Sequence, residues 1–342
     1  MHRMLRTFFS ALGVLPLASS NKLQLFLTIY SWTMTLFLIS LANYYESQFV
    51  VRWITLGGNV VTGCISPVID FFVYVPLVCH LRQCCRHREQ CREFVGIAKS
   101  DGTFIATTSS VTIIITSALT YYAMTHLAAA NEMSKFQLYK ASIYVFLMYN
   151  CTIITLLFCA VLNALSSRIN NLKNCLTVAA TPSLLRFLDV RKDRVVTLMF
   201  SAVSLHSGFL LITTLDMFCR SVHYSYILLW AYLGSKDAFP FVNYLPFAAA
   251  LVVKIMILVH MAKTCFDAKK SVEEFSSKMF DVVLMRWDLQ QNEHVQLMVL
   301  RQHSIKFAPG GFFELGKRFM ISMVNAIAVY LTVLVQVSNL KS

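Results

Sequence analysis

The chain has 342 residues, of which 57% are apolar and only 14% are charged. Soluble domains carry about 25% charged residues, so this composition excludes an ordinary soluble domain and predicts a helical membrane protein. The net charge of +13 could indicate a nucleic-acid partner, but Lys and Arg cluster in alternate loops, which membrane orientation explains without nucleic acid.

Seven apolar blocks are each long enough to cross a bilayer of about 30 Å as a helix. In chain order, the predicted spans are 23–45, 54–81, 103–126, 138–165, 195–218, 244–263 and 315–337. The stretch 224–233 is apolar but too short to span, so it either extends the fifth helix or forms a helix in an outer loop. We therefore predict an all-α polytopic membrane protein with a single domain over residues 1–342.

Basic residues fall mostly in the segments that alternate with the N-terminus. The opposite side carries only Arg52, Lys135, Lys140, Arg220, Lys236 and Lys341. The positive-inside rule then predicts a multi-pass membrane protein whose N-terminus is cytoplasmic and whose C-terminus lies on the opposite, outer side. A heptahelical G-protein-coupled receptor has the reverse orientation, so the charge pattern argues against that class.

Segments next to the fourth and sixth spans keep a helical period of apolar residues. Residues 166–176 continue the fourth span, and the first part of 264–305 continues the sixth. A separate amphipathic helix follows at about 292–305. Because such helices need a cover for their apolar faces, we predict a packed cytoplasmic layer that could join subunits. The alternative is helices that lie on the membrane surface.

Four ionisable residues lie inside the spans, namely Asp70, His206, Asp216 and Lys254. Each would cost on the order of a few kcal/mol if it faced lipid, so each should face the helix bundle. They would line a ligand pocket or an ion route, or Asp216 and Lys254 would form a structural pair. A lone histidine such as His206 is more often a core residue with satisfied hydrogen bonds.

Catalytic motifs are missing from the sequence, which has no nucleophile elbow, phosphate-binding loop, dinucleotide fingerprint or HExxH. Cys84, Cys85 and Cys91 lie among Arg and His, but no His/Cys pair there has the spacing of zinc ligands. We therefore expect no enzymatic activity, no cofactor and no metal site.

Aromatic and polar residues gather in the outer halves of the middle spans. The set is Thr116, Thr120, Tyr121, Tyr122, His126, Tyr144, Tyr149, Asn150, Thr213 and Tyr244. Some would anchor the helices at the membrane interface. Others, converging from several spans, would make an amphipathic small-molecule pocket.

The last helix follows a Gly-Gly-Phe-Phe turn and carries Tyr330, Val333 and Val337 on one face, with Gln336 beside it. Apolar residues on a pore face gate by dewetting, and an amide ring can coordinate hydrated cations. The alternative is an ordinary core helix whose glutamine bonds to a neighbour.

The sequence of this last helix and of the turn before it resembles that of the insect gustatory receptors, within the wider gustatory and odorant receptor superfamily. The family carries Gly-Phe-Phe before its last helix, and Gly311-Phe312-Phe313 matches it. Within the last helix, the family motif is Thr-Tyr, then five mostly apolar residues, then Gln-Phe. This chain keeps its Tyr and Gln as Tyr330 and Gln336, and it has Val in place of the Thr and of the last Phe. Residues 166–172 also resemble the family's signature after the fourth helix.

The resemblance implies a gustatory receptor of the plasma membrane that acts as a ligand-gated, non-selective cation channel. It would be a homo- or heterotetramer with a central pore in the lipid bilayer. Residues 23–263 would be the ligand-binding helices, 264–313 the cytoplasmic anchor and 314–338 the pore helix. Monovalent and divalent cations would pass a gate at Val333 and Val337 and the amide of Gln336, with Tyr330 beside them. The small-molecule tastant would bind among Thr120, Tyr121, Tyr144, Tyr149, Asn150, His206, Asp216, Tyr244 and Lys254.

Two departures from the family pattern carry expectations. Leu331 stands where sugar-receptor members carry Glu, which argues against that branch, and Val337 predicts a wider or softer gate than Phe would give. The rival hypothesis is a non-channel seven-helix receptor or scaffold, which an N-terminal tag accessible on intact cells would favour.

Overall fold

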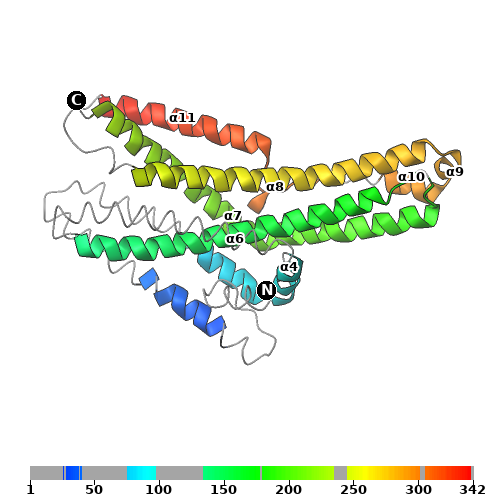
Figure 1. Cartoon of the computed structure of the whole chain (residues 1–342), viewed down its shortest axis with the longest axis horizontal. Helices are drawn as coiled ribbons and strands as arrows, with labels where there is room; N and C mark the ends of the chain where they lie inside the picture. The colour runs from blue at the N-terminus through cyan, green and yellow to red at the C-terminus, as the bar shows by residue number, and fades with distance from the viewer. Residues whose placement is uncertain are drawn as a thin grey trace.

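Three long helices form the frame of the computed structural model shown in Figure 1. They are α6 (Ser134–Asn174), α7 (Pro182–Gly234) and α8 (Leu245–Leu284), and they pack against one another. The structure describes residues 26, 28–37, 39–40, 75–97, 134–177, 179–234, 245–300 and 305–339. All regular elements in these ranges are helical, as the sequence predicts.

The four last predicted spans lie in α6, α7, α8 and α11 (Lys317–Asn339), and the stretch 224–233 continues α7. The described part of the first span is helical. The second span is described only from residue 75, where a helix over 75–86 leads to α4 (Arg88–Ile97), while the third span and Asp70 lie outside the described residues. By length and composition, Asn150–Asn174 and Pro182–Ser225 could each cross a membrane.

The core is centred on α6. Residues 150–162 of this helix are all buried, and Phe158, Leu162 and Leu165 have no measurable exposure. A helix that is apolar on every side belongs at the centre of a bundle, because no side of it can face water. The predicted fourth span is therefore the helix around which α7 and α8 pack.

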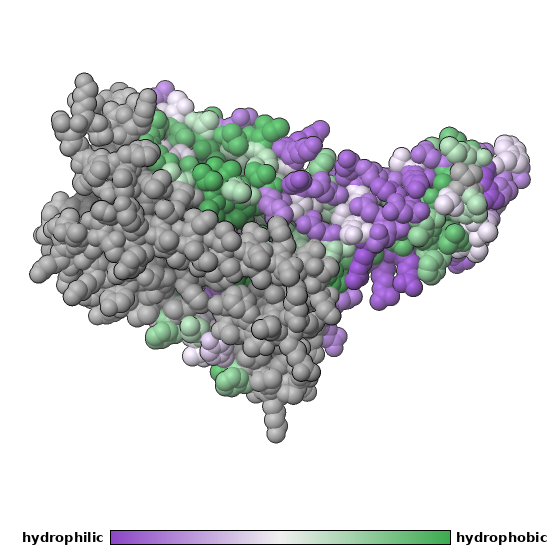
Figure 2. Space-filling model, viewed as in Figure 1, coloured by the Kyte–Doolittle hydropathy of each residue, from purple (hydrophilic) through white to green (hydrophobic). Residues whose placement is uncertain are grey.

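One end of the bundle extends into a distal arm, which we define as residues 166–177, 179–194 and 264–300. It contains the end of α6, the start of α7, the end of α8, and the short helices α9 (Trp287–Gln290) and α10 (Glu293–Leu300). The helical continuation of the fourth and sixth spans and the separate helix after residue 292 are thus confirmed. Figure 2 shows hydrophilic side chains over the middle of this arm and hydrophobic ones over the visible part of α8 and α11.

Polar contacts tie the helices of the distal arm together. The Ser166 and Ser271 hydroxyls lie 2.8 Å apart, and Lys173 Nζ lies 2.6 Å from Glu274 Oε2. The Lys173 ammonium donates a hydrogen bond to this carboxylate and lowers the pKa of Glu274 below its ordinary value. Arg286 donates to the Ala180 carbonyl at 2.7 Å and so closes the tip of the arm.

Candidate functional site

A tight turn, η3 (Pro309–Gly311), leads towards the last helix. Gly310 and Gly311 have φ of 60° and 77°, a region that glycine occupies without steric cost. A Cβ on Gly310 would also lie 3.0 Å from the Phe312 ring. The Gly310 N–H donates to Ser207 Oγ of α7 at 2.7 Å. The predicted Gly-Gly-Phe-Phe turn is present, and it fixes the approach to α11 against α7.

Further contacts hold one side of α11 to its own chain. Lys269 Nζ of α8 lies 2.8 Å from Glu314 Oε1 just before the helix, and Lys317 Nζ lies 4.3 Å from the centre of the Phe266 ring. Near the other end, the rings of Phe218 and Tyr330 meet edge to face, with centroids 5.7 Å apart. This last contact links the fifth predicted span directly to a predicted pore residue.

The opposite side of α11 is uncovered in the single chain. Ile321 and Val329 are exposed on it, and Val333 is 48% exposed. Val324 is exposed too, but on a different flank of the helix, about 180° around from Val333. Gln336 is exposed as well. Tyr330 combines its contact to Phe218 with an exposed edge. Val337 lies within the helix, but its side chain is outside the described residues.

A buried ion cluster joins α7 and α8 in the membrane-spanning part of the bundle. Arg220 Nε donates to Asp216 Oδ1 at 2.5 Å, and Lys254 Nζ donates to Asp216 Oδ2 at 2.9 Å. All three side chains are only 5–6% exposed. The predicted pair of Asp216 and Lys254 is therefore present, with a second cation added.

Sequence reasoning missed Arg220 as a member of this cluster. The sequence suggests only a basic residue of the outer side, whereas the structure shows that Arg220 lies within α7 and is buried. Its position four residues after Asp216 is the signal that could have placed it, because residues i and i+4 are neighbours on a helix surface.

Three buried polar oxygens of α6 and α7 have no hydrogen-bond partner among the described residues. Asn150 Oδ1, Thr213 Oγ1 and Thr214 Oγ1 are buried and make no hydrogen bond within the part of the chain that the structure describes. Thr213 lies three residues before Asp216, on the same face of α7. Asn150 precedes Cys151 of α6, which lies within electrostatic range of both Asp216 and Lys254. Thr213 therefore lies beside the ion cluster, whereas Thr214, two residues before Asp216, points to the opposite side of α7.

The remaining pocket candidates do not all join this region. His206 Nδ1 lies 2.9 Å from the Ala202 carbonyl oxygen, and its ring packs against His80 and Phe158. It is a core histidine, about 15 Å along α7 from Asp216. Thr120, Tyr121 and Tyr244 lie outside the described residues, as do the side chains of Tyr144 and Tyr149 on α6. Within the described ranges, no group of three or more His, Cys, Asp or Glu could hold a metal ion.

The matches to known proteins cover nearly the whole chain. The model of the 7tm chemosensory receptor family matches residues 2–339. The structure of the insect olfactory receptor OR5 from Machilis hrabei is similar, with 12% identity, a TM-score of 0.66, and coverage of 98% of this chain and 99% of that one. The same receptor in complex with eugenol has 12% identity and a TM-score of 0.58, with the same coverage of both chains.

The likeness to the two receptor structures establishes a shared fold, that of a seven-helix membrane protein. No curated protein sequence gave a significant match. Because the family model spans the chain almost from end to end, this protein belongs to the 7tm chemosensory receptor family.

Proposed function

We propose that this receptor is a gustatory, ligand-gated, non-selective cation channel in which four copies of α11 surround a pore. The observation that carries the proposal is the one-sided attachment of α11. Its contacts to α7 and α8 leave the opposite side exposed, and that side includes Gln336. An amide facing hydrocarbon is costly, so Gln336 needs water or another protein chain as its surroundings. A water-filled pore between four copies supplies both.

The gate would lie at Val333 and Val337. A ring of apolar side chains closes a pore by excluding water, and a ring of amides below or above it coordinates hydrated cations. Tyr330 stands one turn before Val333, so a movement of Tyr330 would be transmitted to the gate along a rigid helix.

Ligand binding would reach the gate through α7. Asp216 of the buried ion cluster is two residues from Phe218, and the Phe218 ring packs on Tyr330 of α11. A ligand held at the cluster would shift this part of α7 and carry Tyr330 with it. The outer part of α7 would therefore couple the ligand site to the pore.

The tip of the distal arm would provide contacts between subunits. Its exposed apolar side chains are Phe280, Leu284, Met285, Trp287, Leu297 and Leu300. Figure 2 shows hydrophobic patches at this end, and apolar surface of this kind marks interaction sites.

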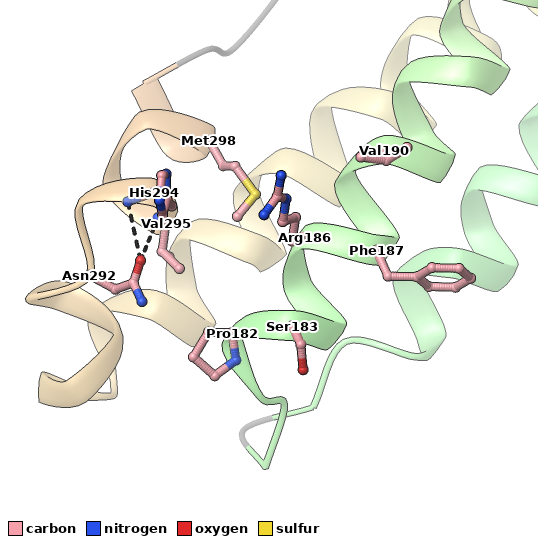
Figure 3. Close-up of a pocket in the computed structure, with 9 residues that line it drawn as sticks. All are labelled: Pro182, Ser183, Arg186, Phe187, Val190, Asn292, His294, Val295 and Met298. Atoms are coloured by element: carbon pink, nitrogen blue, oxygen red, sulfur yellow. Dashed lines mark hydrogen bonds between the residues drawn. The ribbon is translucent and has the colours of Figure 1, made fainter.

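A groove of about 450 Å³ lies between the start of α7 and α10 in the same region. Figure 3 shows Met298 of α10 extending towards Arg186 across the groove, while Asn292 Oδ1 accepts hydrogen bonds from the His294 and Val295 N–H groups. Asn292 thereby fixes the start of α10, one wall of the groove.

Cysteine accessibility during recording tests the pore assignment. We expect a cationic thiol reagent to reduce the current of a Val333→Cys channel in the presence of ligand. Val324→Cys is the matched control. It is 60% exposed, and at about 100° per residue it points away from Val333 on the same helix. A block at both positions, or only at Val324, would refute the assignment of the Val333 face to the pore.

A further inference from the structure

We infer that a basic patch, formed by Lys263, Lys270, Lys317 and Arg318, binds the phosphate headgroup of an anionic phospholipid. The inference goes beyond the proposed channel, because it concerns the surrounding lipid and not the tastant or the ions. The patch lies where α8 passes the start of α11, and all four of its side chains are exposed.

An aromatic ring gathers the basic patch at one place. Lys317 Nζ lies 4.3 Å from the centre of the Phe266 ring, so the start of α11 is held against α8. Lys263 lies three residues before Phe266 and Lys270 lies four residues after it, and side chains at these spacings are neighbours on a helix surface. Three ammonium groups are therefore brought to one side of α8.

The charges of the basic patch are largely left over by the fold. Among the described residues, neither the Lys263 nor the Arg318 side chain has an ion-pair partner. Lys270 Nζ lies 3.6 Å from Glu274 Oε1, a long contact that leaves its side chain 59% exposed. The ring beneath Lys317 carries no net charge. These cations remain available to an anion from outside the chain.

Two carboxylates lie close to the basic patch without cancelling it. Glu314 pairs with Lys269, a cation outside the patch, at 2.8 Å. Asp267 lies on the same side of α8 as Lys263 and Lys270 and is half-buried. One carboxylate beside four cations leaves a positive surplus, and such a surplus favours an anionic headgroup over a zwitterionic one.

The level of the basic patch along the helices points to a lipid as the source of the anion. The exposed side chains of α8 change from apolar at Val259 to basic at Lys263. Those of α11 change in the opposite direction, from Lys317 and Arg318 to Ile321. Figure 2 shows hydrophobic surface on the visible part of these two helices and hydrophilic surface next to it, towards the distal arm. The patch therefore lies at the edge of the apolar layer, where lipid headgroups lie.

The predicted orientation of the chain places this edge in the cytoplasmic leaflet, which holds the anionic lipids of a cell membrane. Each Lys or Arg near an anionic surface increases affinity about fivefold. A phosphoinositide suits the basic patch best, because several phosphates on one headgroup can accept hydrogen bonds from several cations at once.

The experiment measures thermal unfolding of the purified full-length protein in a neutral detergent. The three additives are dioctanoyl phosphatidylinositol bisphosphate, dioctanoyl phosphatidylcholine and the soluble headgroup inositol trisphosphate. We expect the first to raise the Tm at concentrations at which the other two do not. Lys263→Gln combined with Lys317→Gln should raise its half-maximal concentration about 25-fold, at about fivefold for each cation. Lys263→Arg combined with Lys317→Arg should leave the response unchanged.

Arg191→Gln is the matched control. The Arg191 guanidinium is exposed and lies 5.0 Å from the centre of the Phe187 ring, so this variant removes a cation from the same kind of contact. Its neighbour Lys192 lies against Phe275, which is about 18 Å beyond Lys263 along α8. Arg191 is therefore out of reach of the headgroups, and the response to the lipid should not change.

Equal stabilisation by phosphatidylcholine or by inositol trisphosphate, or no stabilisation by any additive, would overturn the inference. A loss in Arg191→Gln as large as in Lys263→Gln would overturn it as well. If the double variant does not fold, Lys263→Gln alone replaces it, with an expected change of about fivefold. Ion flow does not enter this measurement, so its result stands apart from the fate of the proposed channel.

Discussion

The helices α6 and α11 are both apolar, but the chain treats them in opposite ways. Residues 150–162 of α6 are buried on all sides, whereas Met323 is the one buried side chain among those described in α11. The helix α6 finds its cover within its own chain, and α11 must find most of its cover elsewhere. The contrast teaches that α6 stabilises the fold of one subunit, while α11 is left available for lipid, water or other copies.

Truncating one large or apolar side chain in each helix should give the largest difference in the free energy of unfolding. We expect Phe158→Ala in α6 to lower the free energy of unfolding by about 3–5 kcal/mol, because a cavity forms where no side chain can fill it. Val324→Ala, at an exposed position of α11, should change it by about 0.5 kcal/mol or less. Unfolding in mixed micelles measures both. Losses of similar size would break the contrast between the two helices.

The second largest difference should come from two ionic contacts, the buried cluster around Asp216 and the partly exposed pair of Glu314 with Lys269. Asp216→Ala would leave two buried cations without their shared carboxylate, so we expect a loss of about 3 kcal/mol. Glu314→Ala removes a partly exposed pair with Lys269, where solvent screens the charges, and about 0–1 kcal/mol should be lost. The same unfolding measurement applies, and a larger effect at Glu314 would contradict the account.

The aromatic contact between α7 and α11 should affect gating more than folding. An edge-to-face pair contributes about 0.5–1.5 kcal/mol beyond its buried area, which corresponds to about a 2- to 12-fold change in an equilibrium. We expect Phe218→Ala to shift the half-maximal ligand concentration within that range. Phe200→Ala, at an exposed position of the same helix, is the control. Equal shifts from both variants would remove α7 as the coupling element.

The smallest effect should appear at low pH in the distal arm. The Lys173 hydrogen bond lowers the pKa of Glu274, so the folded arm favours the ionised carboxylate. Its stabilising contribution is present above the ordinary pKa of about 4.3 and is lost as pH falls through the lower folded value. The Tm of Glu274→Gln should therefore lie slightly below that of the unaltered chain at neutral pH and approach it in acid. A constant difference at all pH values would contradict this link.

Hydropathy and periodicity were sufficient for the helices of the fourth to seventh spans, because burial of an apolar side leaves a regular pattern in the sequence. The turn at Gly310 and Gly311 and the pairing of Asp216 with Lys254 followed from local chemistry. The burial of Arg220 was missed, since an arginine close to a predicted helix end reads as a loop residue. The difference in side-chain burial between α6 and α11 could not be predicted from the sequence either, because an apolar side chain is equally stable against protein and against lipid.

The assembly of α11 is the central claim, and an image of the purified full-length particle tests it most directly. The account predicts a particle with four-fold symmetry, in which four copies of α11 surround the axis and the distal arms meet below them. A monomeric particle, or an oligomer with α11 on its outer rim, would contradict it.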